Sequence, residues 1–217
     1  MTRGSGERDF LSDLLPNLCR LLSANKTLSV ALGDDCAESA WGDDKLLLAT
    51  DMLLEGVHFD LSKTTAAEVG RKALAVNLSD VAAMAGTPMH ALVSLGLPRH
   101  GGRQLADGVM AGITALAAEH DVSIAGGDTN AWNGPLVVNV AIIGKASPLG
   151  SVTRRGARIG DKIVVTGALG GSIFSRHLSF SPRLAAAKII REGYRPSAMI
   201  DLSDGLATDL PHILLLS

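Results

Sequence analysis

The stretch AAEVGRKALAVNLSDVAAMAGTPMHALVSLGL, residues 66–97, decides the class of fold. Its first part, residues 66–85, carries apolar side chains at the spacing of one helix face, so it predicts a helix that ends at Gly86-Thr87-Pro88. Residues 90–97 then form an apolar run closed by Pro98, which predicts a strand. A helix followed directly by an apolar strand is typical of an α/β protein.

The same alternation continues on both sides of this stretch. Upstream, residues 10–22 have helical spacing, and residues 45–50 (KLLLAT) form a short apolar run that predicts a buried strand ending at Asp51. Downstream, residues 105–116 repeat the helical spacing and residues 136–144 (LVVNVAIIG) are the strongest strand signal. We therefore predict an α/β fold, in the broad sense that includes α+β.

A change of composition indicates a domain boundary. Residues 148–160 are rich in Gly and Arg and have no apolar pattern, so we predict one domain over residues 1–148 and the start of a second over 149–217. The second domain is predicted to hold a strand at 161–166, a helix from Ser181-Pro182 to Gly193, and a short strand at 198–201. Its last residues, 213–217, form an apolar run without a capping Gly, so we expect this domain to be incomplete.

Composition excludes several classes of function. The formal net charge is −2 and the basic residues are scattered, which argues against a nucleic-acid-binding protein. No apolar stretch approaches the roughly 20 residues of a membrane span, and the polar N-terminus does not resemble a secretory signal. Cys19 and Cys36 lack metal-ligand spacing and fit small apolar residues in a reducing compartment, so we expect a cytoplasmic protein.

Aspartates beside glycines or at the ends of apolar runs carry the chemical signal. These acidic positions are Asp34, Asp35, Asp51, Asp80, Asp128, Asp201 and Asp204. Ligand sites of open α/β sheets collect at the carboxyl ends of strands, and Asp51, Asp128 and Asp201 each follow a predicted strand. Gathered carboxylates repel one another unless cations lie between them, which favours Mg²⁺ or Mn²⁺ held together with substrate phosphates. For any one aspartate, a turn or a helix cap is the alternative.

Other familiar catalytic signals are missing from the sequence. There is no Walker A motif, no protein-kinase signature and no G-x-S-x-G nucleophile elbow. The turn at residues 167–172 (GALGGS) precedes a predicted helix and fits either an anion site or a plain tight turn. His58 lies soon after Asp51, which makes it a candidate, although a lone histidine usually serves the fold.

Several of these motifs together resemble the thiamine-monophosphate kinases, a family related to aminoimidazole ribonucleotide synthetase and selenide-water dikinase. The matching segments are residues 33–37, 50–51 with 55–59, 72–84, 126–129, 153–157 with 160–161, and 200–206. The resemblance implies an N-terminal domain whose mixed sheet pairs with that of a second subunit, making a homodimer, and a C-terminal domain that covers the ATP site. It also implies transfer of a phosphoryl group from ATP to thiamine phosphate, giving thiamine diphosphate and ADP.

The resemblance assigns roles to individual positions. It implies several Mg²⁺ ions held by Asp35, Thr50, Asp51, Asp80, Asp128, Asp201 and Asp204. It implies nucleotide contacts from Gly127, Asp128, Arg154 and Ser203, and a contact to thiamine phosphate from His58. Phosphoryl transfer chiefly needs in-line positioning and neutralised charge, which this inventory can supply without a covalent intermediate.

Two departures and two alternatives accompany the resemblance. Ala49 stands where the family often has Ser, and the family usually continues past the point where this chain stops. One alternative is another enzyme of the same superfamily, although Cys19 sits in an apolar helical pattern that does not suit the reactive residue of selenide-water dikinase. The other is a non-catalytic binding or dimerisation module.

Overall fold

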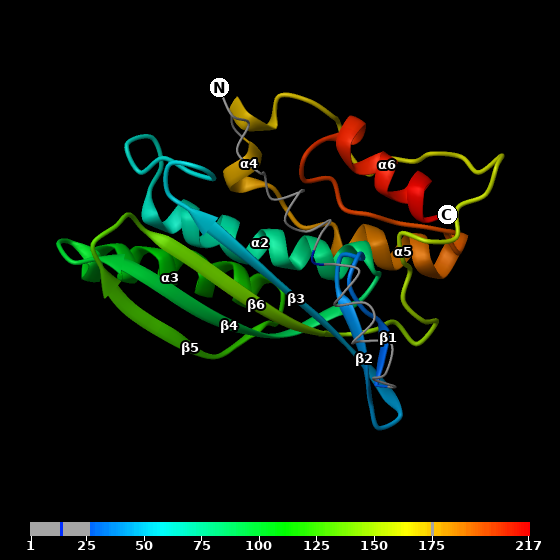
Figure 1. Ribbon diagram of the computed structural model, residues 1–217, viewed down its shortest axis with the longest axis horizontal. Coiled ribbons are helices and arrows are strands. Elements are labelled where there is room, and N and C mark those ends of the chain that lie inside the picture. Colours follow the sequence, from blue (N-terminus) through cyan, green and yellow to red (C-terminus); the bar gives the residue numbers. More distant parts are fainter. Residues whose placement is uncertain (1–13, 15–26, 175) are drawn as a thin grey trace.

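The structure is a computed structural model that describes residues 14, 27–174 and 176–217 (Figure 1). The helix predicted for residues 10–22 lies outside the described residues except for residue 14, and Cys19 lies outside them as well. Sheet and helix alternate through the first part of the chain, which confirms the predicted α/β class.

Six strands form one mixed sheet in the order β1-β2-β3-β6-β4-β5. They are β1 (Leu28–Val30), β2 (Ala37–Trp41), β3 (Asp44–Leu54), β4 (Thr87–Pro98), β5 (Ser123–Trp132) and β6 (Val137–Lys145). Strands β4 and β5 run parallel, and all other neighbouring pairs are antiparallel. Helix α3 (Gly102–Glu119) connects the parallel pair, because such a pair needs a long crossover.

Helices α2 (Ala66–Ala83) and α3 cover one face of the sheet (Figure 1). A capping box starts α2, in which the Thr65 hydroxyl accepts from the Glu68 backbone N–H and the Glu68 carboxylate accepts from that of Thr65. The largest fully buried side chains of the core are Leu47, Leu74, Leu78, Met84, Ile113, Leu116, Leu136 and Ile142. Burial of this apolar surface is the main term that holds the helices to the sheet.

Two glycines allow α2 and α3 to pack with their backbones in contact. A Cβ added to Gly112 would lie 1.9 Å from the carbonyl oxygen of Ala67, and one added to Gly70 would lie 2.0 Å from that of Val109. Both positions therefore require glycine for steric reasons rather than for backbone conformation. This close approach fixes α2 against α3 and so fixes the side chains that α2 presents on its other face.

The second part of the chain lies on α2, on the side away from the sheet (Figure 1). It contains a 3₁₀ turn (Ser172–Phe174) and three helices, α4 (Arg176–Ser179), α5 (Leu184–Tyr194) and α6 (Leu206–Leu216). The strands predicted at 161–166 and 198–201 are wrong, since both segments are irregular. A strand needs a neighbour along its length for its backbone hydrogen bonds, and the described sheet includes neither segment, although the Met199 N–H donates to the carbonyl oxygen of Thr153 at 3.1 Å.

The other expected elements are found with shifted ends. The helix predicted at 66–85 and the strand at 90–97 are α2 and β4, and the run 136–144 is β6. The strand predicted at 45–50 is β3, which continues to Leu54, so Asp51 lies within the strand rather than after it. The helix expected from Pro182 begins at Leu184, with Arg183 as its N-cap. The division into two domains at residue 148 stays a prediction.

Gly112→Ala tests the close packing of the two helices. The added methyl group has no space beside the Ala67 carbonyl, so we expect the free energy of unfolding to fall by about 1–3 kcal/mol. Urea denaturation measures it. Gly193→Ala on α5 is the control, because a Cβ there meets nothing within 4 Å and Ala favours a helix by about 1 kcal/mol. Equal effects of the two substitutions would contradict this packing.

Candidate functional site

Three carboxylates from distant parts of the chain meet in one place. Asp35 lies in the loop between β1 and β2, Asp80 near the end of α2, and Asp201 in the segment before α6. One ligand oxygen from each can be chosen so that all three lie within 4.8 Å of one another. Three hard oxygen donors at this spacing have the chemistry of a site for Mg²⁺ or Mn²⁺.

Burial and mutual repulsion make this cluster costly in its ionised form. Burial, followed by the charges of Asp51, Asp201 and Asp35, raises the pKa of Asp80 to about 9. Burial, followed by the charge of Asp35, also raises the pKa of Asp201, although the Ser79 hydroxyl donates to its carboxylate at 3.0 Å. Divalent cations between the carboxylates would remove this cost, so the donor set fits the magnesium ions that the resemblance implies.

Arg154 is the cation nearest the cluster. Its Nη2 donates to Asp35 Oδ1 at 2.7 Å and its Nε to Asp35 Oδ2 at 3.3 Å, a two-pronged ion pair. Its backbone N–H donates to the carboxylate of Asp34, at 3.1 and 3.2 Å. Burial raises the pKa of Asp34, and this backbone hydrogen bond partly offsets the rise. Arg154 therefore places a positive charge against the carboxylates from the side of the second part of the chain.

A buried carboxylate holds the segment that carries Arg154. Glu38 of β2 accepts hydrogen bonds from Ser29 at 2.5 Å, from Lys45 at 2.6 Å and from Ser151. These hydrogen bonds, led by the one from Lys45, lower the pKa of Glu38 despite its burial. Ser151 precedes Arg154 by three residues, so Glu38 ties this segment to the sheet beside the cluster.

A second buried aspartate shapes the loop after Asp201. The Asp209 carboxylate accepts from the backbone N–H groups of Ser203, Asp204 and Gly205 at 3.0–3.1 Å. These contacts fold residues 203–205 into a tight loop at the start of α6. The loop directs Ser203 and Asp204 to the same cleft that holds the carboxylate cluster.

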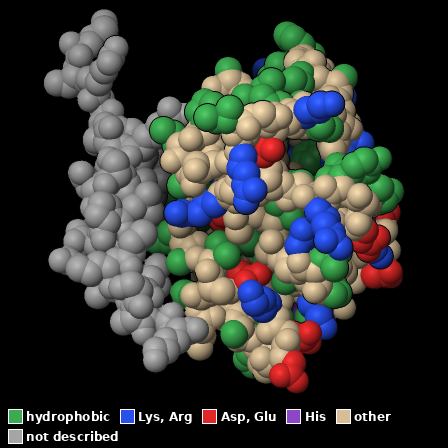
Figure 2. Space-filling view, turned by 90° about the vertical axis from the view of Figure 1, so that its right-hand side faces the viewer, with side chains coloured by type: hydrophobic (Ala, Val, Ile, Leu, Met, Phe, Trp, Pro, Cys, Tyr) green, Lys and Arg blue, Asp and Glu red, His purple; other side chains and the backbone are tan. Residues whose placement is uncertain are grey.

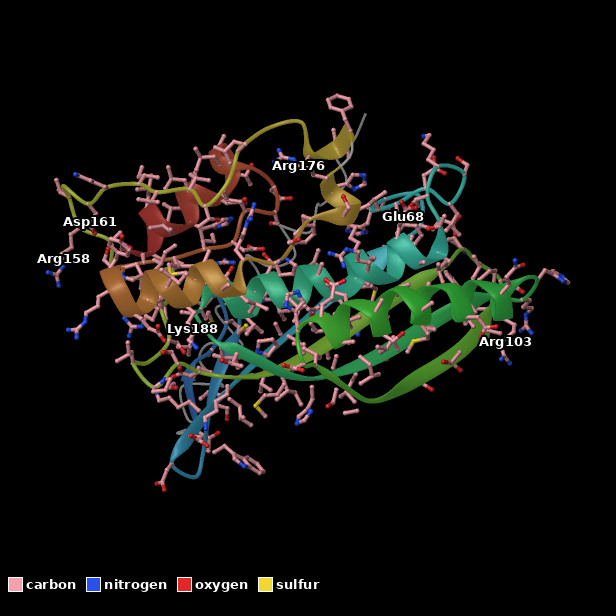
Figure 3. The ribbon with its side chains drawn as sticks, turned by 180° about the vertical axis from the view of Figure 1, so that it is seen from behind. Glu68, Arg103, Arg158, Asp161, Arg176 and Lys188 are labelled. Carbon is pink, nitrogen blue, oxygen red and sulfur yellow. The ribbon has the colours of Figure 1, made fainter. Side chains whose placement is uncertain are left out.

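This cleft lies between α2, the β1–β2 loop and the second part of the chain, and its lining continues onto residues of β3 and β6. Figure 2 shows Lys and Arg side chains spread over one end of the molecule, and Figure 3 shows Arg176 on the segment above α2 and Arg158 at one end of the molecule, beyond α5. The cationic residues that line the cleft are Lys72, Arg154, Arg158, Lys162, Arg176, Arg183 and Arg195. Cations around a carboxylate cluster suit polyphosphates that bind together with metal ions.

Most of the predicted site residues line this cleft. Asp51 points from β3 to the helix side of the sheet, where burial raises its pKa and the nearby His58 lowers it. The Thr50 side chain points to the opposite face, where its hydroxyl contacts Asn139 and the carbonyl of Val140. Of the predicted cluster the structure therefore joins three carboxylates, places Asp51 nearby, and turns the Thr50 hydroxyl away.

Gly127 and Asp128 lie apart from the cluster. Both belong to β5, which is separated from β3 by two other strands, and both line a smaller pocket beside α3. Asp128 accepts from the backbone N–H of Thr129 and from the side chain of Asn130. A Cβ on Gly127 would lie 1.7 Å from the carbonyl oxygen of Val93, so close strand packing accounts for this glycine. Their roles as ligands stay predictions.

Sequence reasoning missed Ser79, Glu38 and Asp209. Ser79 belongs to the segment NLSD, and its place beside Asp80 was the signal that could have found it. No signal in the sequence marked Glu38 or Asp209, because their partners are backbone groups or side chains that only the fold brings near.

No helix among the described residues is long and apolar enough to cross a membrane.

Comparison with known proteins gives the same family as the motifs. Residues 33–146 match the family described as AIR synthase related protein, N-terminal domain. The thiamine-monophosphate kinase of Rhodopirellula baltica is 38% identical over 195 residues, and that of Bacillus subtilis is 30% identical over 224. A solved structure described as AaThiL complexed with AMPPCP and TMP covers 100% of this chain with a TM-score of 0.86 and 31% identity.

The chain belongs to the AIR synthase related family and, within it, to the thiamine-monophosphate kinases. It spans 61% of the length of the Rhodopirellula relative, 69% of the Bacillus relative and 72% of the solved AaThiL chain. These matches cover 86%, 93% and 100% of this chain. The resemblance therefore extends over both parts of the structure, including the cleft between them.

Asp80→Asn tests the electrostatic cost of the cluster. Because the pKa of Asp80 is raised from 3.8 to about 9, the folded chain holds a proton that the unfolded chain has lost between those pH values. Stability in the presence of EDTA should therefore fall as pH rises from 5 to 9, by at most about 1.4 kcal/mol per pH unit. Asp80→Asn should flatten this slope in urea denaturation, whereas substitution of the exposed Asp43 by Asn should not. A slope equal in all three proteins would contradict the assignment.

Proposed function

We propose that this chain takes part in Mg²⁺-dependent phosphoryl transfer from ATP to thiamine phosphate, giving thiamine diphosphate and ADP. The observation that carries the proposal is the meeting of Asp35, Asp80 and Asp201 in a cleft lined by cationic side chains. It is supported by the named relatives and by the AaThiL structure, whose AMPPCP is an analogue of ATP and whose TMP we take as thiamine monophosphate.

Magnesium would be held first by the three clustered carboxylates. Asp51 and Asp204 line the same cleft and complete the proposed set there. Thr50, whose hydroxyl contacts Asn139 and the carbonyl of Val140, and Asp128, which lines the smaller pocket, are assigned by the resemblance alone. When bound, the ions supply positive charge that neutralises the phosphate oxygens. Arg154 pairs with Asp35 and adds a fixed positive charge beside the proposed metal site.

Nucleotide and acceptor would occupy different parts of the cleft. Arg154 and Ser203 lie on the segments next to Asp35 and Asp201, so we assign them to the nucleotide. Gly127 and Asp128 line the separate pocket beside α3, and their assignment to the nucleotide rests on the resemblance alone. His58 lies on the loop after β3 and is assigned to the phosphate of the acceptor. The acceptor phosphate is already ionised at neutral pH, so the residues of the cleft orient and neutralise it and need not remove a proton.

Formation of product from defined substrates tests this function. The chain should release ADP from ATP in a manner that requires both Mg²⁺ and thiamine phosphate, and mass spectrometry should detect thiamine diphosphate. The Bacillus subtilis relative serves as positive control. Asp51→Asn keeps the volume of the side chain and loses its charge, so it should abolish both product formation and Mg²⁺-dependent binding of AMPPCP. ADP release that is indifferent to thiamine phosphate, or nucleotide binding without product, would favour the non-catalytic alternative.

A homodimer formed through the sheet is part of the same proposal. No described helix covers the face of the sheet opposite α2 and α3, and this face exposes 37% of Leu48, 53% of Met52 and 40% of Leu92. The strand register sets Leu48 beside Ile143 and Leu92 beside Ala141, so the apolar side chains form a continuous patch. A second copy covering this patch would remove apolar surface from water.

We place the protein in the cytoplasm for the reasons of composition given above.

Leu92→Lys tests the dimer. A charge at the centre of the uncovered face should shift the molar mass in solution from that of a dimer to that of a monomer, measured by multi-angle light scattering. Ile189→Lys on α5 is the control, because Ile189 is 63% exposed and lies on the second part of the chain. A wild-type protein that stays monomeric over a wide range of concentration would contradict the proposed dimer.

A further inference from the structure

Lys72 joins two histidines that are far apart in the sequence. Its Nζ donates to the backbone carbonyl of His58 at 2.8 Å and lies 3.3 Å from Nδ1 of His177. The three residues come from α2, from the loop after β3 and from α4, and Figure 1 shows α4 above the N-terminal half of α2. All three line the cleft that holds the carboxylate cluster.

The hydrogen bonds fix which ring nitrogens carry protons. Nδ1 of His58 accepts from the backbone N–H of Leu54 at 3.0 Å, so its proton is on Nε2. Nδ1 of His177 faces the ammonium of Lys72, which has no lone pair to offer, so this ring also carries its proton on Nε2. Burial and the charge of Lys72 lower the pKa of His177, in accord with a neutral ring.

Three N–H donors are therefore left for a ligand. Lys72 has three N–H groups and uses two of them, on His58 and His177. Within the described part of the chain, neither Nε2 atom has a hydrogen-bond partner from the protein. The terminal phosphate of a monoester carries three oxygens and up to two negative charges, which matches three donors and one ammonium.

We infer that Lys72 and His177 join His58 in a subsite for the phosphate group of the acceptor, in the same cleft that Arg154 lines. This inference rests on the proposed function and extends it, since it says which side chains recognise the acceptor by its phosphate. Lys72 contributes the charge and holds the ring of His177 in the tautomer that donates, while the backbone N–H of Leu54 does this for the ring of His58. His177 links the subsite to α4, so the second part of the chain takes part in binding the acceptor.

Two phosphate ligands and one control ligand test the subsite by NMR. The probes are thiamine phosphate, methyl phosphate and thiamine, each added to ¹⁵N-labelled chain with Mg²⁺ and AMPPCP. Both phosphates should shift the ring ¹⁵N signals of His58 and His177, and thiamine should not. The substitutions Lys72→Met and His177→Ala should each lower the affinity for thiamine phosphate and for methyl phosphate by about ten- to hundredfold. They should leave the affinity for AMPPCP unchanged. His177→Gln keeps an N–H donor and should recover part of the loss.

Matched variants control for charge and for general damage. Lys188→Met removes an exposed lysine of α5, labelled in Figure 3, and His100→Ala removes an exposed histidine, and neither residue lines the cleft. Both variants should bind the two phosphates like the wild type. Methyl phosphate affinity within threefold of wild type in Lys72→Met would overturn the subsite. Binding of methyl phosphate without binding of thiamine phosphate would instead overturn the proposed acceptor and leave the subsite standing.

Discussion

The fold holds three carboxylates together against their mutual repulsion, and this repulsion is the constraint that the surrounding packing has to overcome. Asp35, Asp80 and Asp201 come from three separate elements, and one raised pKa of about 9 shows how unfavourable their full ionisation is. A fold gains nothing in stability from such an arrangement, since hydrophobic side chains would fill the space at lower cost. Under the proposed function, cations and phosphates that enter the site would offset this cost.

Several contacts elsewhere in the molecule serve to hold that arrangement. Gly70 and Gly112 let α2 pack tightly on α3, which sets the position of Asp80. Glu38 holds the segment of Arg154, and Asp209 holds the loop that follows Asp201. Each contact joins the site to a different part of the core. The site is therefore a product of the whole packing and belongs to no single motif.

Local patterns predicted the elements well, because apolar periodicity is a local property. Helix α2 and strand β4 were predicted to within a few residues, and the aspartates were recognised as a group. The prediction that ligands collect at strand ends was less successful, since Asp51 lies inside β3 and the cluster draws on a loop and a helix instead. Lys72 and His177 are 105 residues apart, and only tertiary packing brings them into contact.

The most direct test of the account is a crystal structure of the chain with Mn²⁺ and AMPPCP, using the anomalous scattering of manganese. We predict an anomalous peak among the carboxylates of Asp35, Asp80 and Asp201, with oxygens at roughly 2.0–2.2 Å and the phosphates of AMPPCP next to it. A structure in which AMPPCP is bound but these three carboxylates hold no manganese would contradict it.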